Sequence, residues 1–81
     1  MNNYLIAFDL EAPLDEHKYV LFKLTALNAR KLLDTVFVVT AIGQTASEIA
    51  DDLTRLLHGN DRALVIRITD DYGAVNLLEH I

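Results

Sequence analysis

Residues 3–10 of this chain, with the sequence NYLIAFDL, constrain its fold more than any other segment. Alternate side chains of a strand point to opposite faces. Both faces of this strand would be apolar, with Tyr4, Ile6 and Phe8 on one and Leu5 and Ala7 on the other. A strand that is apolar on both faces is normally covered on both sides and lies inside its sheet. We therefore predict that this strand is central and that it ends at Asp9.

The size and composition of the chain favour one small domain that associates with itself. Its 81 residues suffice for a single domain over 1–81. Hydrophobic residues make up 52% of the chain, although a domain of this size buries only a modest share of its surface. The excess of apolar side chains predicts a partner surface, most simply that of a homodimer.

Charge and patterning narrow the range of partners and compartments. The net charge of -5 disfavours broad binding to nucleic acid, which requires clustered Lys and Arg, although a local basic patch remains open. The chain has no cysteine, which fits a reducing cytoplasm. We expect neither a signal peptide nor a membrane partner, because no apolar run approaches the roughly 20 residues that cross a bilayer.

The segment after Pro13 predicts a helix over 14–28, since proline suits a helix entry. Its main apolar stripe, at helical spacing, consists of Val20, Leu21, Leu24 and Leu27. A second stripe on roughly the opposite side consists of Tyr19, Phe22 and Ala26. The second stripe indicates either another neighbour, such as a covering loop, or an exposed adhesive patch.

The middle of the chain predicts two strands, over 30–33 and 35–41, because it is rich in β-branched and aromatic residues. A turn at Asp34 and Thr35 would separate them, and one bent continuous strand is the alternative.

A second helix is predicted over 46–58. Thr45 and Glu48 have the spacing of a capping box, and Gly59 suits the left-handed conformation that follows a helix. A last strand is predicted over 62–69. Its inward side chains would be Leu64, Ile66 and Ile68, and its outward side chains Ala63, Val65 and Arg67. Residues 70–81 receive no assignment, although an edge strand added to a partner's sheet would cover their apolar side chains.

The order β-α-β-β-α-β predicts an α+β, ferredoxin-like fold: a four-stranded antiparallel sheet with both helices on one face. We expect the first and third strands to be central and parallel, and the last strand to flank the first. Asp9 would then lie near Asp61 and Arg62, at the start of the last strand, and also near Thr40. The other sheet face would stay apolar and pair with a second copy.

Two segments of the chain carry a resemblance to known proteins. Residues 4–10, YLIAFDL, and residues 33–39, LDTVFVV, resemble the corresponding strands of the small SinR-type proteins. That group is similar to the CRISPR-associated endoribonuclease and integration-scaffold family, and more distantly to the virulence-associated protein D ribonucleases. In the CRISPR-associated family an aspartate after an aromatic residue ends the first strand, as Phe8 and Asp9 do here. The resemblance implies a dimer formed through sheet faces and swapped C-terminal strands.

The site residues that follow from these patterns are few. If the chain is a nuclease, Asp9 of two copies would share one Mg²⁺, which would activate water for phosphodiester cleavage. The alternative is that Asp9 stabilises the following turn or pairs with Arg62. Arg30 and Lys31 stand where the family contacts nucleic acid. His17, His58 and His80 match no metal motif, and structural roles are expected for them.

Three functions remain open on this basis. The first is a small dimeric binding or scaffold protein with a nucleic-acid-related role. The second is a Mg²⁺-dependent endonuclease acting on RNA or DNA through Asp9, and the third is a component of a toxin–antitoxin pair. For the dimer we predict an interface made of Tyr4, Ile6, Phe8, Val75, Leu77 and Leu78.

Overall fold

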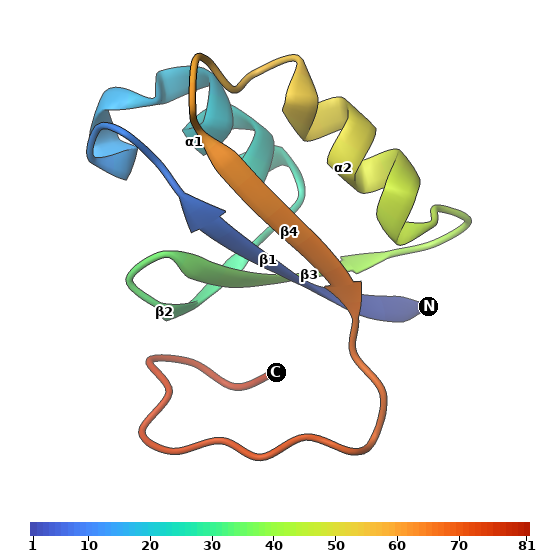
Figure 1. The fold of residues 1–81 in the computed structure, drawn as a ribbon. Helices are drawn as coiled ribbons and strands as arrows, with labels where there is room; N and C mark the ends of the chain where they lie inside the picture. The colour runs from blue at the N-terminus through green and yellow to red at the C-terminus, as the bar shows by residue number, and fades with distance from the viewer.

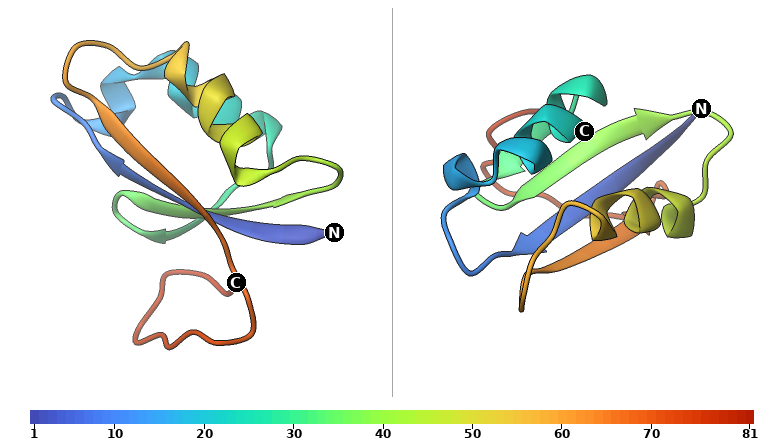
Figure 2. Two further views of the ribbon diagram at one scale, coloured as in Figure 1. Left: turned by 45° about the vertical axis from the view of Figure 1, so that its right-hand side comes forward. Right: turned by 90° about the horizontal axis from the view of Figure 1, so that it is seen from above.

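The computed structural model describes residues 1–81 and contains one four-stranded antiparallel sheet with two helices on one of its faces (Figures 1 and 2). The strands are β1 (Asn2–Asp9), β2 (Arg30–Leu33), β3 (Val36–Ala41) and β4 (Arg62–Arg67). The helical elements are the 3-10 turn η1 (Leu14–Glu16) and the helices α1 (Lys18–Ala26) and α2 (Ala46–Thr54). The predicted α+β, ferredoxin-like arrangement is confirmed.

The strand order is β2-β3-β1-β4, so β1 is central as predicted. The expectation that β1 and β3 run parallel was wrong, because they pair antiparallel. The crossover through α1 makes β1 parallel to β2, and the hairpin turn at Asp34 and Thr35 then reverses the chain into β3. Thr40 therefore lies opposite Asn3, at the far end of β1 from Asp9, whereas the predicted pairing of Asp9 with Arg62 is present.

The main core lies between the sheet and the helices. Its buried members are Tyr4, Ile6, Phe8, Val20, Leu24, Phe37, Val39, Ala41, Ile49 and Leu53. The rings of Phe8 and Phe37 pack edge to face with centroids 6.0 Å apart. The assignment of Tyr4, Ile6 and Phe8 to a dimer interface was wrong, because the helices of the same chain cover these side chains.

The helix boundaries follow local hydrogen bonding. Thr45 and Glu48 form the predicted capping box, in which the hydroxyl of Thr45 accepts from the N–H of Glu48 at 3.2 Å and the carboxylate of Glu48 accepts from the N–H of Thr45 at 3.0 Å. α2 ends at Thr54 rather than at residue 58, and a turn leads to Gly59 with φ +57°. In α1, Tyr19 and Phe22 are exposed, so no loop covers the second stripe.

The two faces of β4 are the reverse of the prediction. The register places Val65 opposite Ile6 and Ile66 opposite Leu5. Because paired residues share a face, Val65 packs against the main core, and Leu64 and Ile66 point to the face away from the helices. The sequence could not show which side of β4 faces the helices, since both alternate sets of its side chains include apolar residues.

The C-terminal segment, residues 68–81, crosses the sheet face opposite the helices, and we call it the strap (Figure 1). It begins directly after β4, where Ile68 N–H donates to Asn3 O of β1 at 2.8 Å. It then reaches β2, where Leu78 N–H donates to Leu32 O at 2.9 Å. Leu32 and Val38 are buried on this face at 2% and 0% exposure. The strap therefore forms a second, smaller core with its own sheet and contains no added strand.

Candidate functional site

Asp9 lies at the end of β1 in an ion pair with Arg62 of the neighbouring strand. Arg62 Nη2 donates to Asp9 Oδ2, and the two side chains are 78% and 67% exposed. Water screens an ion pair this open, so it contributes little to folding. The geometry is that of the alternative considered for Asp9, an ion pair with Arg62.

Arg30 and Lys31 do not form a common patch. Arg30 lies opposite Val38, on the strap side of the sheet, and its Nε donates to His80 O of the strap at 3.0 Å. Lys31 lies opposite Phe37, on the helix side. The alternation of a strand thus separates the two predicted nucleic-acid contacts.

The most connected polar side chain is Asp61, which the sequence predicted to lie in a turn near Asp9. Its side chain is 2% exposed. Oδ1 accepts from Glu11 N–H at 2.9 Å, and Oδ2 accepts from His58 N–H at 3.1 Å and from His17 Nε2 at 3.1 Å. The Glu11 N–H lowers the pKa of the Asp61 carboxyl most, with the His58 N–H next, and burial opposes them.

Glu11 completes a reciprocal lock between two loops. Its carboxylate accepts from Asn60 N–H at 2.8 Å, while its own N–H donates to Asp61. Two hydrogen bonds therefore join the β1–α1 connector to the α2–β4 loop, and each segment supplies one backbone N–H and one carboxylate. We call the set Glu11, His17 and Asp61 the interlock. No sequence signal marked it, because its parts are 50 and 44 residues apart and come together only when β1 and β4 pair.

The His17 ring sits between two acceptors. Nδ1 lies 3.1 Å from Pro13 O and Nε2 lies 3.1 Å from Asp61 Oδ2. The Pro13 carbonyl raises the pKa of His17 most. Asp61 and Glu16 also raise it, and burial lowers it. The side chain is 10% exposed, so the ring is held within the loop pair.

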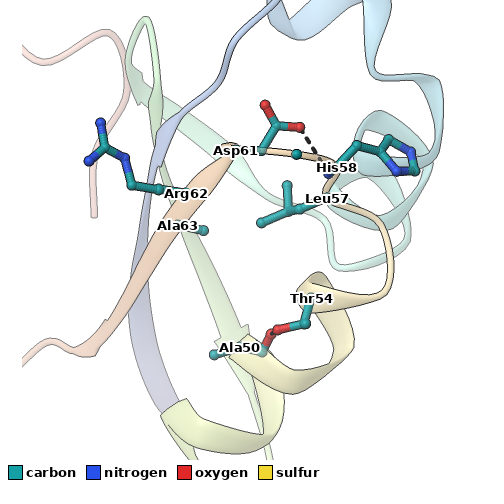
Figure 3. A pocket seen from close by; sticks show the side chains of 8 residues that line it. Ala50, Thr54, Leu57, His58, Asp61, Arg62 and Ala63 are labelled. Atoms are coloured by element: carbon teal, nitrogen blue, oxygen red, sulfur yellow. Dashed lines mark hydrogen bonds between the residues drawn. The ribbon is translucent and has the colours of Figure 1, made fainter.

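A hollow of about 510 Å³ opens between the end of α2 and the start of β4 (Figure 3). Several of its polar groups already have partners. Thr54 donates to Ala50 O at 3.0 Å, Asp61 is engaged in the interlock, and Arg62 points away from the hollow toward Asp9. Figure 3 also shows the His58 ring turned away from Asp61, whose carboxylate binds the His58 backbone instead. The hollow shows no nucleophile paired with a base.

The structure contains no group of three or more His, Asp or Glu side chains placed to hold a metal ion. None of its helices has the length and apolar character required to span a bilayer.

The fold and these contacts define a small α+β protein of ferredoxin-like arrangement, with a loop interlock at one end of the sheet and a strap across one face. Comparisons with protein-family models, with curated proteins and with solved structures found no match.

Proposed function

We propose that this chain is a small homodimeric binding protein whose two copies join along β4 to form one continuous sheet. The observation that carries the proposal is the outer edge of β4, with which no other segment of the chain pairs. An unpaired edge strand presents a row of free N–H and C=O groups that another strand can join.

Two hydrogen bonds fix which residues of β4 point outward. Ile68 N–H donates to Asn3 O of β1. The backbone groups of every second residue before Ile68, namely Ile66, Leu64 and Arg62, therefore also point toward β1. The second bond leads to the same assignment. Phe8 N–H donates to Thr35 O on the β3 side of β1, so Phe8 and Ala63, which lie opposite each other, form no hydrogen bonds between them. The backbone groups of Ala63, Val65 and Arg67 therefore point away from the sheet.

The side chains beside this edge suit a second copy of the same strand. Leu64 and Ile66 are 56% and 49% exposed on the strap side. An antiparallel pair centred on Val65 places Leu64 of one copy opposite Ile66 of the other, and Ala63 opposite Arg67. In this register the outward backbone groups of Ala63, Val65 and Arg67 of each copy form hydrogen bonds with the other copy. Apolar side chains lie opposite each other, and no like charges do.

The same dimer keeps the two Asp9 residues apart. With about 3.4 Å per residue along a strand and about 4.8 Å between strands, the two Asp9 Cα atoms lie roughly 25 Å from one another. Mg²⁺ binds its ligands at about 2.1 Å. A metal shared by two Asp9 residues thus requires a different dimer, and the β4 dimer favours the binding role over the nuclease role.

The chemistry of the surface also bears on what the dimer would bind. Each copy brings a net charge of -5, and Arg30 and Lys31 face opposite sides of the sheet. A nucleic-acid backbone is bound by clustered cations. We therefore propose a protein partner in preference to nucleic acid.

The test is the mass of the particle in solution, measured by sedimentation equilibrium for the parent chain and two lysine variants. Ile66→Lys places a charge at the proposed joint. Ile42→Lys is the matched control, because Ile42 is an equally apolar, exposed residue after β3. We expect a dimer for the parent and for Ile42→Lys, and a folded monomer for Ile66→Lys. A parent chain that stays monomeric at high micromolar concentration, or an Ile66→Lys variant that dimerises like the parent, contradicts the proposal.

A further inference from the structure

Both ring nitrogens of His17 face atoms that can only accept hydrogen bonds. Nδ1 lies against the carbonyl oxygen of Pro13 and Nε2 against the carboxylate of Asp61, each at 3.1 Å. Neutral imidazole carries one N–H and one lone pair, whereas imidazolium carries two N–H groups. The protonated ring is therefore the one form that donates to both neighbours.

Either neutral form leaves one repulsive contact. With the proton on Nε2, the lone pair of Nδ1 faces the Pro13 carbonyl oxygen. With the proton on Nδ1, the lone pair of Nε2 faces Asp61, whose side chain is 2% exposed. Loss of one proton thus removes one of the two hydrogen bonds, and a bond that remains to Asp61 loses the assistance of the positive charge.

We infer that His17 and Asp61 form a proton-operated latch, which ties the β1–α1 connector to the α2–β4 loop while His17 is charged and loosens when His17 becomes neutral. The latch acts at the start of two elements. His17 immediately precedes α1, and its carbonyl accepts the helical hydrogen bond from Leu21 N–H. Asp61 immediately precedes β4.

The other charged groups around the ring are few. Glu16 on η1 favours the charged ring, and Glu11 is committed to Asn60 N–H on the opposite loop. Lys18 and His58 line, together with His17, a second hollow of about 400 Å³. Lys18 is the one permanent cation among them. The Pro13 carbonyl, Asp61 and Glu16 raise the pKa of His17, and burial is the effect that lowers it.

The direction of the pH effect follows from these shifts. The pKa of His17 is raised from 6.5 on folding, so its contribution is complete below pH 6.5 and is lost as the pH rises through the folded value. The pKa of Asp61 is lowered from 3.8, so its contribution is complete above pH 3.8 and is lost as the pH falls through the folded value. The latch is therefore tightest between pH 3.8 and 6.5 and loosens on the alkaline side.

The experiment follows the three histidine rings and selected amide protons of the parent chain by NMR from acid to mildly alkaline pH. We expect His17 to titrate above 6.5. As it loses its proton, the exchange protection of the Glu11 and His58 amides, corrected for intrinsic rates, should fall at least several-fold. Protection of the Ile68 amide, which bonds Asn3 at the other end of the sheet, should not change with it.

Two variants separate the latch from general effects of pH. In His17→Gln the ring that titrates is gone, so protection of the Glu11 and His58 amides should no longer depend on pH. In His58→Gln the dependence should persist, because His58 contributes its backbone N–H to Asp61. A His17 that titrates below 6.5 in the parent, or an unchanged pH dependence in His17→Gln, overturns the inference.

Discussion

Replacement of Leu32 by alanine tests whether the strap forms a true second core. Leu32 is 2% exposed, although it lies on the sheet face away from both helices, and its carbonyl accepts from Leu78 N–H of the strap. It lines an apolar cavity of about 190 Å³ together with Tyr72, Leu77 and Ile81 of the strap. If the strap is packed as the structure shows, this side chain is as buried as a residue of the main core.

The expected loss follows from the atoms removed. Leucine to alanine deletes about three carbon groups at about 0.8 kcal/mol each, hence about 2.4 kcal/mol for lost burial. The cavity left behind raises the loss to about 3 kcal/mol or more. Leu33 is the comparison, because it is the adjacent leucine and lines the same cavity but is 46% exposed. Its truncation should lower the free energy of unfolding by about 1 kcal/mol, since only about half of the same transfer is lost.

Urea unfolding followed by circular dichroism measures both losses. With a slope of about 1 kcal/mol per molar urea, the midpoint should fall by about 3 M for Leu32→Ala and by about 1 M for Leu33→Ala. Leu77→Ala should combine with Leu32→Ala less than additively, because both side chains line the same cavity. Equal midpoints for Leu32→Ala and Leu33→Ala would refute the packed strap.

Two further substitutions test the capping box and the end of β1. Thr45→Ala should lower the free energy of unfolding by about 1 kcal/mol, because the N–H of Glu48 loses its acceptor; a urea midpoint equal to that of the parent contradicts the role of Thr45 in the capping box. Asp9→Asn should leave the urea midpoint and the dimer unchanged, since the Asp9–Arg62 pair is open to water. The same variant decides the nuclease hypothesis, which predicts cleavage of labelled RNA or double-stranded DNA that chelation and Asp9→Asn abolish equally. Cleavage that persists in Asp9→Asn excludes Asp9 as the metal ligand.

The sequence predicted the fold correctly where a residue pattern is typical of one structure. The doubly apolar run of Tyr4 to Phe8 is typical of an inner strand, and the spacing of Thr45 and Glu48 marked a helix start. The pairing of Asp9 with Arg62 followed from the order of the elements, because the last strand had to flank the first.

The errors arose where the pattern allowed two structures. β4 is apolar at both parities, so its alternation could not show that Val65 faces the helices and Leu64 faces away. The strap lacks regular structure, and apolar residues such as Leu77 could equally have covered a partner. Asp61 has an ordinary position in a turn, and its burial depends on Glu11 and His17, which only the tertiary structure brings to it.

The most direct measurement of the β4 dimer uses the absence of cysteine from the chain, which makes introduced thiols unique. In the proposed register, Leu64 of one copy lies about 4.5 Å from Ile66 of the other between Cα atoms, whereas Leu64 lies about 8 Å from its own equivalent. A disulfide requires less than about 7 Å. We predict that mild oxidation of a mixture of Leu64→Cys and Ile66→Cys chains gives cross-linked heterodimers, while neither variant cross-links alone. No heterodimer from the mixture, or equal cross-linking by each single variant, would contradict pairing along β4.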